Sequence, residues 1–243
     1  MLKKILLISI TTLLMAYLSF AVFYTNTYAK KAVVCKDFQV SIIENSELQY
    51  LSDSDIRNSI TKAGLFPVGK DIAAVNTSEI EKKLEENRLI KQAECFKTVD
   101  GTVRIKVFHR TPILRVFSTN GSYYIDSERE KMPIPENFAA YVPLANGFIS
   151  DEFAKNQLYD FAKFLNHDKF WNSQIKQIYV AQNGDIELTP AVGKHRIILG
   201  KIEDYKENLD KLRIFYDKGL SKVGWNKYSI VNLKYKNQVV CTI

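Results

Sequence analysis

The chain has 243 residues, 46% of them hydrophobic, which is enough for one or two folded units with their own cores. Its formal net charge of +7 comes from basic residues that alternate with acidic ones, as in the stretch from Glu79 to Arg88. A nucleic-acid-binding surface would need a concentrated basic patch, so we expect no nucleic-acid partner. Three cysteines exclude a disulfide-rich scaffold.

The beginning of the chain is typical of a membrane anchor. A short basic segment, residues 1–4, precedes twenty uncharged residues from Ile5 to Tyr24. At about 1.5 Å per residue, this run spans the ~30 Å hydrocarbon core of a bilayer. We expect a cytoplasmic stub at 1–4, a retained transmembrane helix at 5–24 and the bulk of the chain outside the cytoplasm. The alternative is a cleaved signal peptide, whose apolar core usually has about 7–15 residues.

The next part of the chain, residues 37–110, is predicted to form a β-α-α-β-β unit. Three stretches alternate apolar and polar residues and are predicted to be strands: 38–42, 93–99 and 102–108. Ser52 and Asn76 each precede a helical pattern and are followed three positions later by an acidic residue, which is typical of an N-terminal cap. Asp100-Gly101 indicates a two-residue hairpin turn between the last two strands.

Thr111-Pro112 interrupts the alternating pattern and is the expected boundary of a second, strand-rich α/β domain at 111–243. Its predicted strands lie at 113–117, 123–125, 175–181, 186–188, 195–199 and, as one long strand region, at 228–242. Hairpin signals stand at Asn120-Gly121 and Asn183-Gly184. Helical patterns at 150–166 and 204–218 carry apolar stripes. The predicted fold class is therefore α+β.

The sequence offers no catalytic constellation. The three histidines occur in different contexts and without ligand spacing: His109, His167 and His195. A phosphate-binding glycine loop and a serine nucleophile elbow are both missing from the sequence. Asp126 ends a strand before a turn, where a carboxylate usually caps the turn. We therefore expect no enzyme activity, no cofactor and no metal site.

The cysteines are expected to be buried thiols, because free cysteine is among the most buried residue types. They are Cys35, Cys95 and Cys241. Their spacing fits no zinc pattern. A bridge between Cys35 and Cys95 stays open, since each of them lies beside a predicted strand and sequence cannot establish the geometry.

Six short motifs, each weak alone, follow one another along nearly the whole chain: Leu51-Ser52 with Asp55-Ile56, 89–93, 109–112, 124–126, 142–147 and 233–240. In this order they resemble the motifs of the bacterial cell-division family FtsQ, also called DivIB. The chain is identified as a divergent member. Four positions depart from the family pattern: His109 for Glu, Arg129 near an expected turn glycine, Asn232 for Asp and Lys234 for Arg.

The resemblance implies a single-pass protein of the bacterial inner membrane, at the division septum, with a POTRA-like first domain and its bulk in the periplasm. It implies a non-catalytic scaffold that binds the FtsB/FtsL coiled-coil pair and links it to septal peptidoglycan synthesis. Other partners would bind through the transmembrane helix and the POTRA-like domain. The alternative is another POTRA-bearing envelope protein for secretion or outer-membrane assembly, although the sequence shows no tandem POTRA repeats and no run of barrel strands.

The last predicted strand is the expected partner site, because a terminal strand is a natural sheet edge to which an incoming strand can pair. The family resemblance points to the same strand as the receiver of FtsB. The expected partner-binding residues are Leu233, Lys234, Tyr235, Asn237, Gln238, Val239 and Val240. The alternative is an ordinary core strand whose edge is covered by the protein's own chain.

Overall fold

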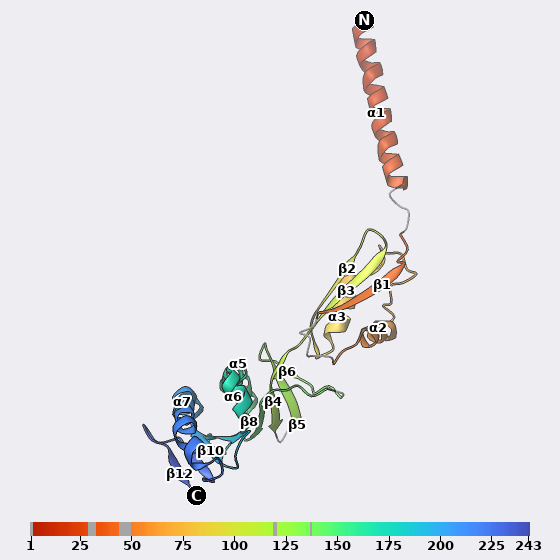
Figure 1. Ribbon diagram of the computed structural model, residues 1–243. Coiled ribbons are helices and arrows are strands. Elements are labelled where there is room, and N and C mark those ends of the chain that lie inside the picture. Colours follow the sequence, from red (N-terminus) through yellow and green to blue (C-terminus); the bar gives the residue numbers. More distant parts are fainter. Residues whose placement is uncertain (1, 29–32, 44–49, 119–120, 137) are drawn as a thin grey trace.

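The computed structural model describes residues 2–28, 33–43, 50–118, 121–136 and 138–243 (Figure 1). Helix α1 (Leu2–Tyr28) stands apart, and the folded part contains two sheets, each with its own hydrophobic core. Within α1, the window Leu7–Tyr24 is long and apolar enough to cross a membrane and overlaps the predicted span. The predicted α+β fold class is confirmed.

The first unit has the predicted β-α-α-β-β order. Its elements are β1 (Asp37–Ile43), α2 (Asp53–Lys62), α3 (Thr77–Glu85), β2 (Ile90–Lys97) and β3 (Thr102–His109). The sheet order is β1-β3-β2, with β1 parallel and β2 antiparallel to the central strand β3. The inward-facing residues of α2 and α3, Ile56, Ile60, Ile80 and Leu84, are buried against this sheet.

Both helix caps of the first unit are confirmed. The Ser52 hydroxyl accepts a hydrogen bond from the Asp55 amide, and the Asp55 carboxylate accepts one from the Ser52 amide, which completes a capping box. The Asn76 side chain accepts from the Glu79 amide. The predicted hairpin at Asp100-Gly101 joins β2 to β3, but the connection is longer than the two residues expected. The connection is residues 98–101, because the Thr98 hydroxyl bonds the Thr102 carbonyl at 2.8 Å and closes a longer loop.

The second unit is a nine-stranded sheet. Its strands are β4 (Pro112–Ser118), β5 (Gly121–Asp126), β6 (Lys131–Met132), β7 (Leu144–Gly147), β8 (Ile175–Val180), β9 (Ile186–Pro190), β10 (Arg196–Gly200), β11 (Ile230–Asn232) and β12 (Val240–Thr242). Their order across the sheet is β12-β11-β10-β9-β8-β7-β4-β5-β6. The short strand β7 was not predicted, and it connects the two halves of the sheet by parallel pairing with β4 and β8.

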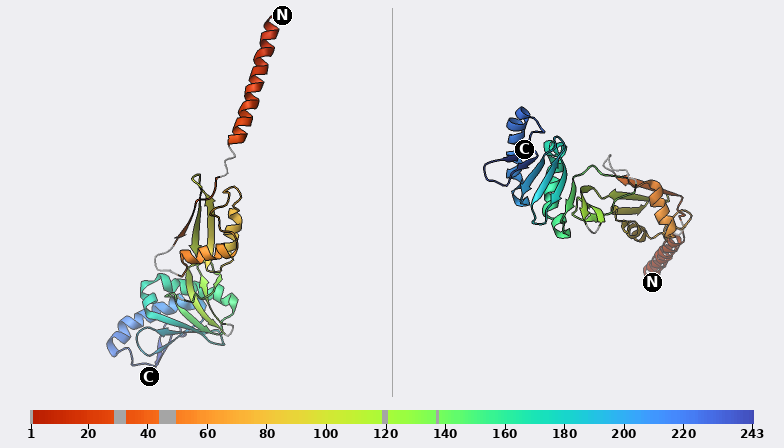
Figure 2. Two further views of the ribbon diagram at one scale, coloured as in Figure 1. Left: turned by 90° about the vertical axis from the view of Figure 1, so that its right-hand side faces the viewer. Right: turned by 90° about the horizontal axis from the view of Figure 1, so that it is seen from below.

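Helices cover one face of this sheet (Figure 2). They are α4 (Asp151–Lys155), α5 (Gln157–His167), α6 (Lys169–Gln174), the 3₁₀ turn η1 (Ile202–Asp204), α7 (Tyr205–Phe215), the π-helical turn η2 (Tyr216–Leu220) and α8 (Ser221–Val223). The single helix predicted at 150–166 is divided at Asn156, whose backbone (φ −110°, ψ −99°) is not helical. Leu158, Phe161 and Leu212 are among the fully buried helix residues.

The two units meet at the turn that joins β5 to β6. Asp126 is 1% exposed and pairs with Arg110 at 2.6 Å, while its other oxygen accepts from the amides of Glu128 and Glu130. The expected turn cap at Asp126 is thus confirmed. Lys91 of β2 pairs with Glu128 at 2.6 Å, so the turn is held from the first unit at two positions.

Arg129 occupies the position near which the family has a glycine. Its φ of 67° lies in the left-handed region that glycine adopts without steric cost. The side chain compensates by pairing with Asp160 at 2.6 Å, donating to the Lys155 carbonyl and lying 4.3 Å from the Tyr159 ring centroid. The contacts of Arg129 with α4 and α5 therefore offset the strain of a left-handed backbone at a residue other than glycine.

Candidate interaction edge

Strand β12 forms one edge of the nine-stranded sheet. It pairs antiparallel with β11, through Ile230 with Thr242, Val231 with Cys241 and Asn232 with Val240. Among the described strands, none lies on its other side. An edge strand presents backbone donors and acceptors that an added strand can satisfy.

The long strand predicted at 228–242 is wrong, because residues 233–239 form a connector between β11 and β12. Asn237 has a φ of 60°, which ends any regular alternation there. Leu233 is fully buried and belongs to the core. Of the expected partner-binding residues, Val240 alone lies in a strand.

The other expected residues lie in the connector. The exposed fraction of the side chain differs among the expected residues. Tyr235 is 48% exposed and Val240, at the start of β12, is 40% exposed. Val239 is partly buried and packs against the core. The expected residues therefore lie in the connector and at the start of β12, and they do not form one continuous strand.

The connector is fixed by two lysines. The Lys211 ammonium of α7 donates to the carbonyls of Leu233 and Tyr235, at 2.8 and 2.9 Å. The Lys234 ammonium reaches Asp185 at 2.7 Å, beside the Asn183-Gly184 hairpin. This hydrogen bond is the main cause of a lowered pKa at Asp185 and of a raised pKa at Lys234. Lys234 therefore ties the connector to the hairpin between β8 and β9.

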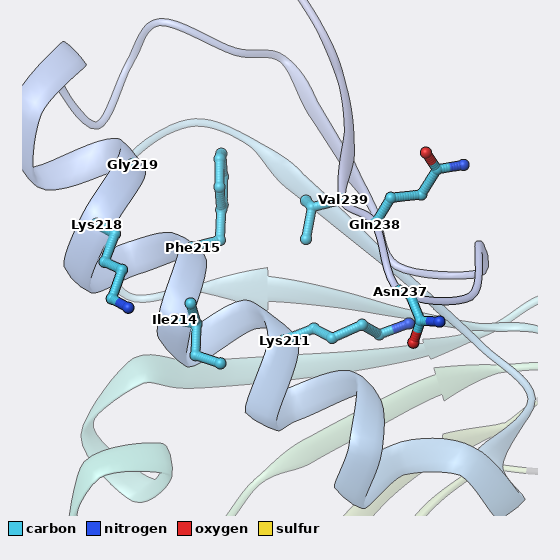
Figure 3. A pocket seen from close by; sticks show the side chains of 8 residues that line it. All are labelled: Lys211, Ile214, Phe215, Lys218, Gly219, Asn237, Gln238 and Val239. Carbon is cyan, nitrogen blue, oxygen red and sulfur yellow. The ribbon is translucent and has the colours of Figure 1, made fainter.

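A groove of about 500 Å³ lies between α7 and the connector (Figure 3). Its lining residues are Lys211, Ile214, Phe215, Lys218, Gly219, Asn237, Gln238 and Val239. Ile214 is 57% exposed, and the apolar side chains of Phe215 and Val239 face the space between the helix and the connector. The groove is thus an apolar recess with ammonium groups along the helix, next to β12.

The helix residues of this groove were not predicted as part of the site. A signal was present, because Lys211, Ile214 and Lys218 share one helix face outside the buried stripe of Leu209 and Leu212. A single exposed isoleucine between two lysines is only a weak signal, because isolated apolar residues are common on protein surfaces. The spacing alone does not say which part of the chain lies opposite.

A buried polar cluster lies at the start of η2, directly after the groove residue Phe215 in the chain. His195 of β10 is 2% exposed, and its Nε2 lies 3.0 Å from the Tyr216 hydroxyl at the start of η2. The Trp225 ring stacks edge-on against Tyr216, with 4.9 Å between ring centroids. Burial lowers the pKa of His195 and raises that of Tyr216. Both side chains are therefore neutral at pH 7, and the cluster is a packing element between β10 and η2.

Reactive groups are scattered across the described residues. No group of three or more His, Cys, Asp or Glu side chains there is arranged to hold a metal ion. All three cysteines are free, so the described structure has no bridge between Cys35 and Cys95. Burial raises the pKa of the Cys95 thiol to about 12, which makes it a poor nucleophile at neutral pH.

Comparisons with known proteins agree with this architecture. Residues 111–242, more than half of the chain, match the family described as FtsQ/DivIB, C-terminal related. Residues 33–108 match the POTRA-like domain family. The search of curated proteins gave no match.

Proposed function

Because the chain belongs to the FtsQ/DivIB family of cell-division scaffolds, we propose that it is a non-catalytic divisome scaffold that binds a partner strand at β12. It acts as a single-pass inner-membrane protein, anchored by α1, with both sheets in the periplasm at the septum. The partner is an FtsB/FtsL-like protein, and through it the scaffold is linked to septal peptidoglycan synthesis. Further partners bind through α1 and the POTRA-like unit.

The observation that carries this proposal is the open side of β12 in the nine-stranded sheet. An incoming strand extends the ladder, so main-chain hydrogen bonds supply affinity and alternate side chains supply specificity. The adjoining groove receives an apolar side chain of the partner, beside Ile214 and Phe215. Lys218, on the same helix, favours an acidic residue in the segment next to that strand.

The sharpest test places a charge on the edge itself. Val240→Glu sets a carboxylate on the outer strand, where burying it under an added strand is costly, and edge charges are a known barrier to strand addition. We expect at least about tenfold weaker capture of the FtsB/FtsL-like proteins, which corresponds to about 1.4 kcal/mol. The measurement is pull-down with the full chain in detergent, and circular dichroism checks folding.

Val192→Glu is the matched control, because Val192 is an exposed valine of the same unit, 45% exposed against 40% for Val240. It should bind the partner as the unsubstituted chain does. A folded Val240→Glu protein with unchanged capture would remove β12 from the interface. Asn237→Pro is unsuitable for this purpose, since proline cannot adopt the φ of 60° found there.

Cys241 provides a second readout on β12 without changing the sequence. It is partly exposed, whereas Cys35 and Cys95 are buried, so a small alkylating reagent should modify Cys241 first. A bound partner strand should slow that modification, and equal rates with and without the partner would contradict strand addition at β12.

The septal location is tested separately with a fluorescent fusion in dividing cells. A midcell band supports the scaffold, and even staining of the envelope favours a POTRA-bearing protein for secretion or outer-membrane assembly.

We also propose that the chain divides at Thr111-Pro112 into domains at 37–110 and 111–243, after a stub at 1–4 and a span at 5–24. Limited proteolysis should leave a resistant fragment that begins near residue 110. A single indivisible fragment that contains both sheets would argue against independent domains.

A further inference from the structure

Three segments of the first unit meet at one end of its sheet: 33–37, 67–72 and 97–101. Backbone hydrogen bonds join them, from the Ile72 amide to the Val33 carbonyl and from the Lys36 amide to the Gly101 carbonyl, each 2.8 Å long. A further bond runs from the Cys35 amide to the Lys70 carbonyl, also at 2.8 Å. The end of the unit is therefore a single ordered surface.

This surface carries four exposed valines, which we call the valine tip: Val33, Val34, Val68 and Val99. Val99 is completely exposed at the end of the β2–β3 hairpin, and the other three are 39–47% exposed. Single exposed apolar residues are ordinary on protein surfaces, but apolar residues gathered on one surface mark an interaction site.

The valine tip lies at the end of the unit from which the chain runs to α1 (Figure 1). Four residues, 29–32, separate Tyr28 of α1 from Val33. Even a fully extended chain covers at most about 3.6 Å per residue, so Val33 is within about 18 Å of the end of α1. The headgroup layer of a bilayer is itself several ångströms thick, and the valine tip is within its reach.

The three segments carry no net charge, so electrostatic attraction does not explain an interaction at this surface. Each of the three segments contributes one lysine and one aspartate, so the charges balance: Lys36 and Asp37, Lys70 and Asp71, Lys97 and Asp100. A neutral surface with apolar side chains at its outermost points suits the membrane interface, where apolar groups leave water while charged side chains remain hydrated.

We propose that the valine tip rests in the headgroup layer of the membrane that α1 crosses, with Val99 inserted deepest. The contact holds the first unit against the bilayer and fixes its direction relative to α1. It is independent of the partner edge on β12, and it depends on α1 remaining attached to the chain.

The test uses the full chain in vesicles that contain brominated phospholipid, which quenches tryptophan by contact. In Val99→Trp, the emission added to that of Trp171 and Trp225 should be quenched at least twofold more than the emission added in Val192→Trp. The control residue is an exposed valine of the second unit, far along the chain from α1. Equal quenching in the two variants would overturn the proposal.

A longer segment between α1 and the first unit distinguishes membrane binding by the valine tip from a contact that the short segment imposes. Twelve Gly/Ser residues inserted after Ala29 should leave the quenching of Val99→Trp nearly unchanged if the valine tip has its own affinity for the bilayer. Loss of quenching on insertion would show that the short tether alone imposes the contact, and would overturn the proposal. High salt should change the quenching little, because the charges balance, and a loss at high salt would contradict the role of the valines.

Discussion

The two edges of the nine-stranded sheet are protected to different degrees. At β6, the strand has two residues, Met132 is fully buried, and the adjoining turn is tied to neighbouring elements by ion pairs of Arg110, Lys91 and Arg129. At β12, Val240 is exposed, and the main ties are those of two lysines to the connector.

The difference shows how one sheet can have a closed and an open end. The β6 edge lies where the first unit meets the second, and Arg110 and Lys91 hold the turn that leads into β6. The connector that leads into β12 is held by Lys211 of α7, and no described strand lies on the outer side of β12. Exposed edges are usually blocked against pairing, and an edge that is not blocked is suited to a partner.

The largest expected effect comes from breaking the closed edge. Arg110→Met leaves the buried Asp126 carboxylate without its ionic partner, and removing one member of a buried pair costs about 3 kcal/mol of unfolding free energy. Urea unfolding of the full chain in detergent, followed by the fluorescence of Trp171 and Trp225, measures it. Arg104→Met, at an exposed position of β3, is the control and should change stability by less than about 0.5 kcal/mol. Equal stability of both variants would contradict the importance of this pair.

A smaller effect on the free energy of unfolding is expected at Arg129. Two variants there separate the backbone strain from the side-chain contacts. Arg129→Ala loses the contacts with Asp160 and Tyr159 and keeps the left-handed backbone, whereas Arg129→Gly loses the contacts and relieves the strain. The glycine variant should therefore be more stable than the alanine variant by about 1 kcal/mol. The same urea titration measures the difference, and an alanine variant as stable as the glycine variant would exclude strain at this turn.

At the open edge, Lys234→Met should lower stability less than either change at the β6 edge. The Lys234 side chain is 45% exposed, and Asp185 keeps a second partner in Lys201, at 3.1 Å, so losing this one ion pair costs little stability. Partner capture should fall more clearly than stability, because the connector next to β12 loses its tie to Asp185. A variant that unfolds as easily as Arg110→Met would show that the two edges are held equally.

The smallest expected effect is a pH dependence of stability that comes from His195. Burial lowers the pKa of His195 in the folded state, so the unfolded chain binds the proton more readily. Stability from this group is complete above its ordinary pKa of 6.5 and is lost as pH falls below that value. Melting temperatures between pH 8 and pH 5 should fall less steeply for His195→Gln than for the unsubstituted chain. An equally steep fall for His195→Gln and the unsubstituted chain would contradict this role of His195.

Local signals in the sequence predicted much of the fold because the interactions behind them are local. The capping box at Ser52 and the hairpin at Asn183-Gly184 depend on residues a few positions apart. The split of the last strand depends on distant residues. Leu233 to Val239 alternates like a strand, but the Lys211 ammonium takes two of its carbonyls and Asn237 turns the backbone.

Contacts between distant residues also determine strand β7 and the position of α7 opposite the connector. Strand β7 has the sequence Leu-Ala-Asn-Gly, which carries little strand propensity, and its pairing with β4 and β8 is what makes it a strand. The sequence predicts a sheet edge for the last strand, and β12 is an edge of the described sheet, but the position of α7 opposite the connector could not be predicted. A contact between a helix and a loop more than twenty residues later follows only from the assembled fold.

The connection from β10 to β11 has a consequence for the order of folding. These two strands are parallel neighbours, so the chain must pass through α7 and η2 before β11 can add to the sheet. Contacts that close such long loops form late and open first. The β11–β12 hairpin should therefore exchange its amide hydrogens faster than the central strands. The proposed partner edge on β12 would then become part of the sheet only after β11 has joined β10.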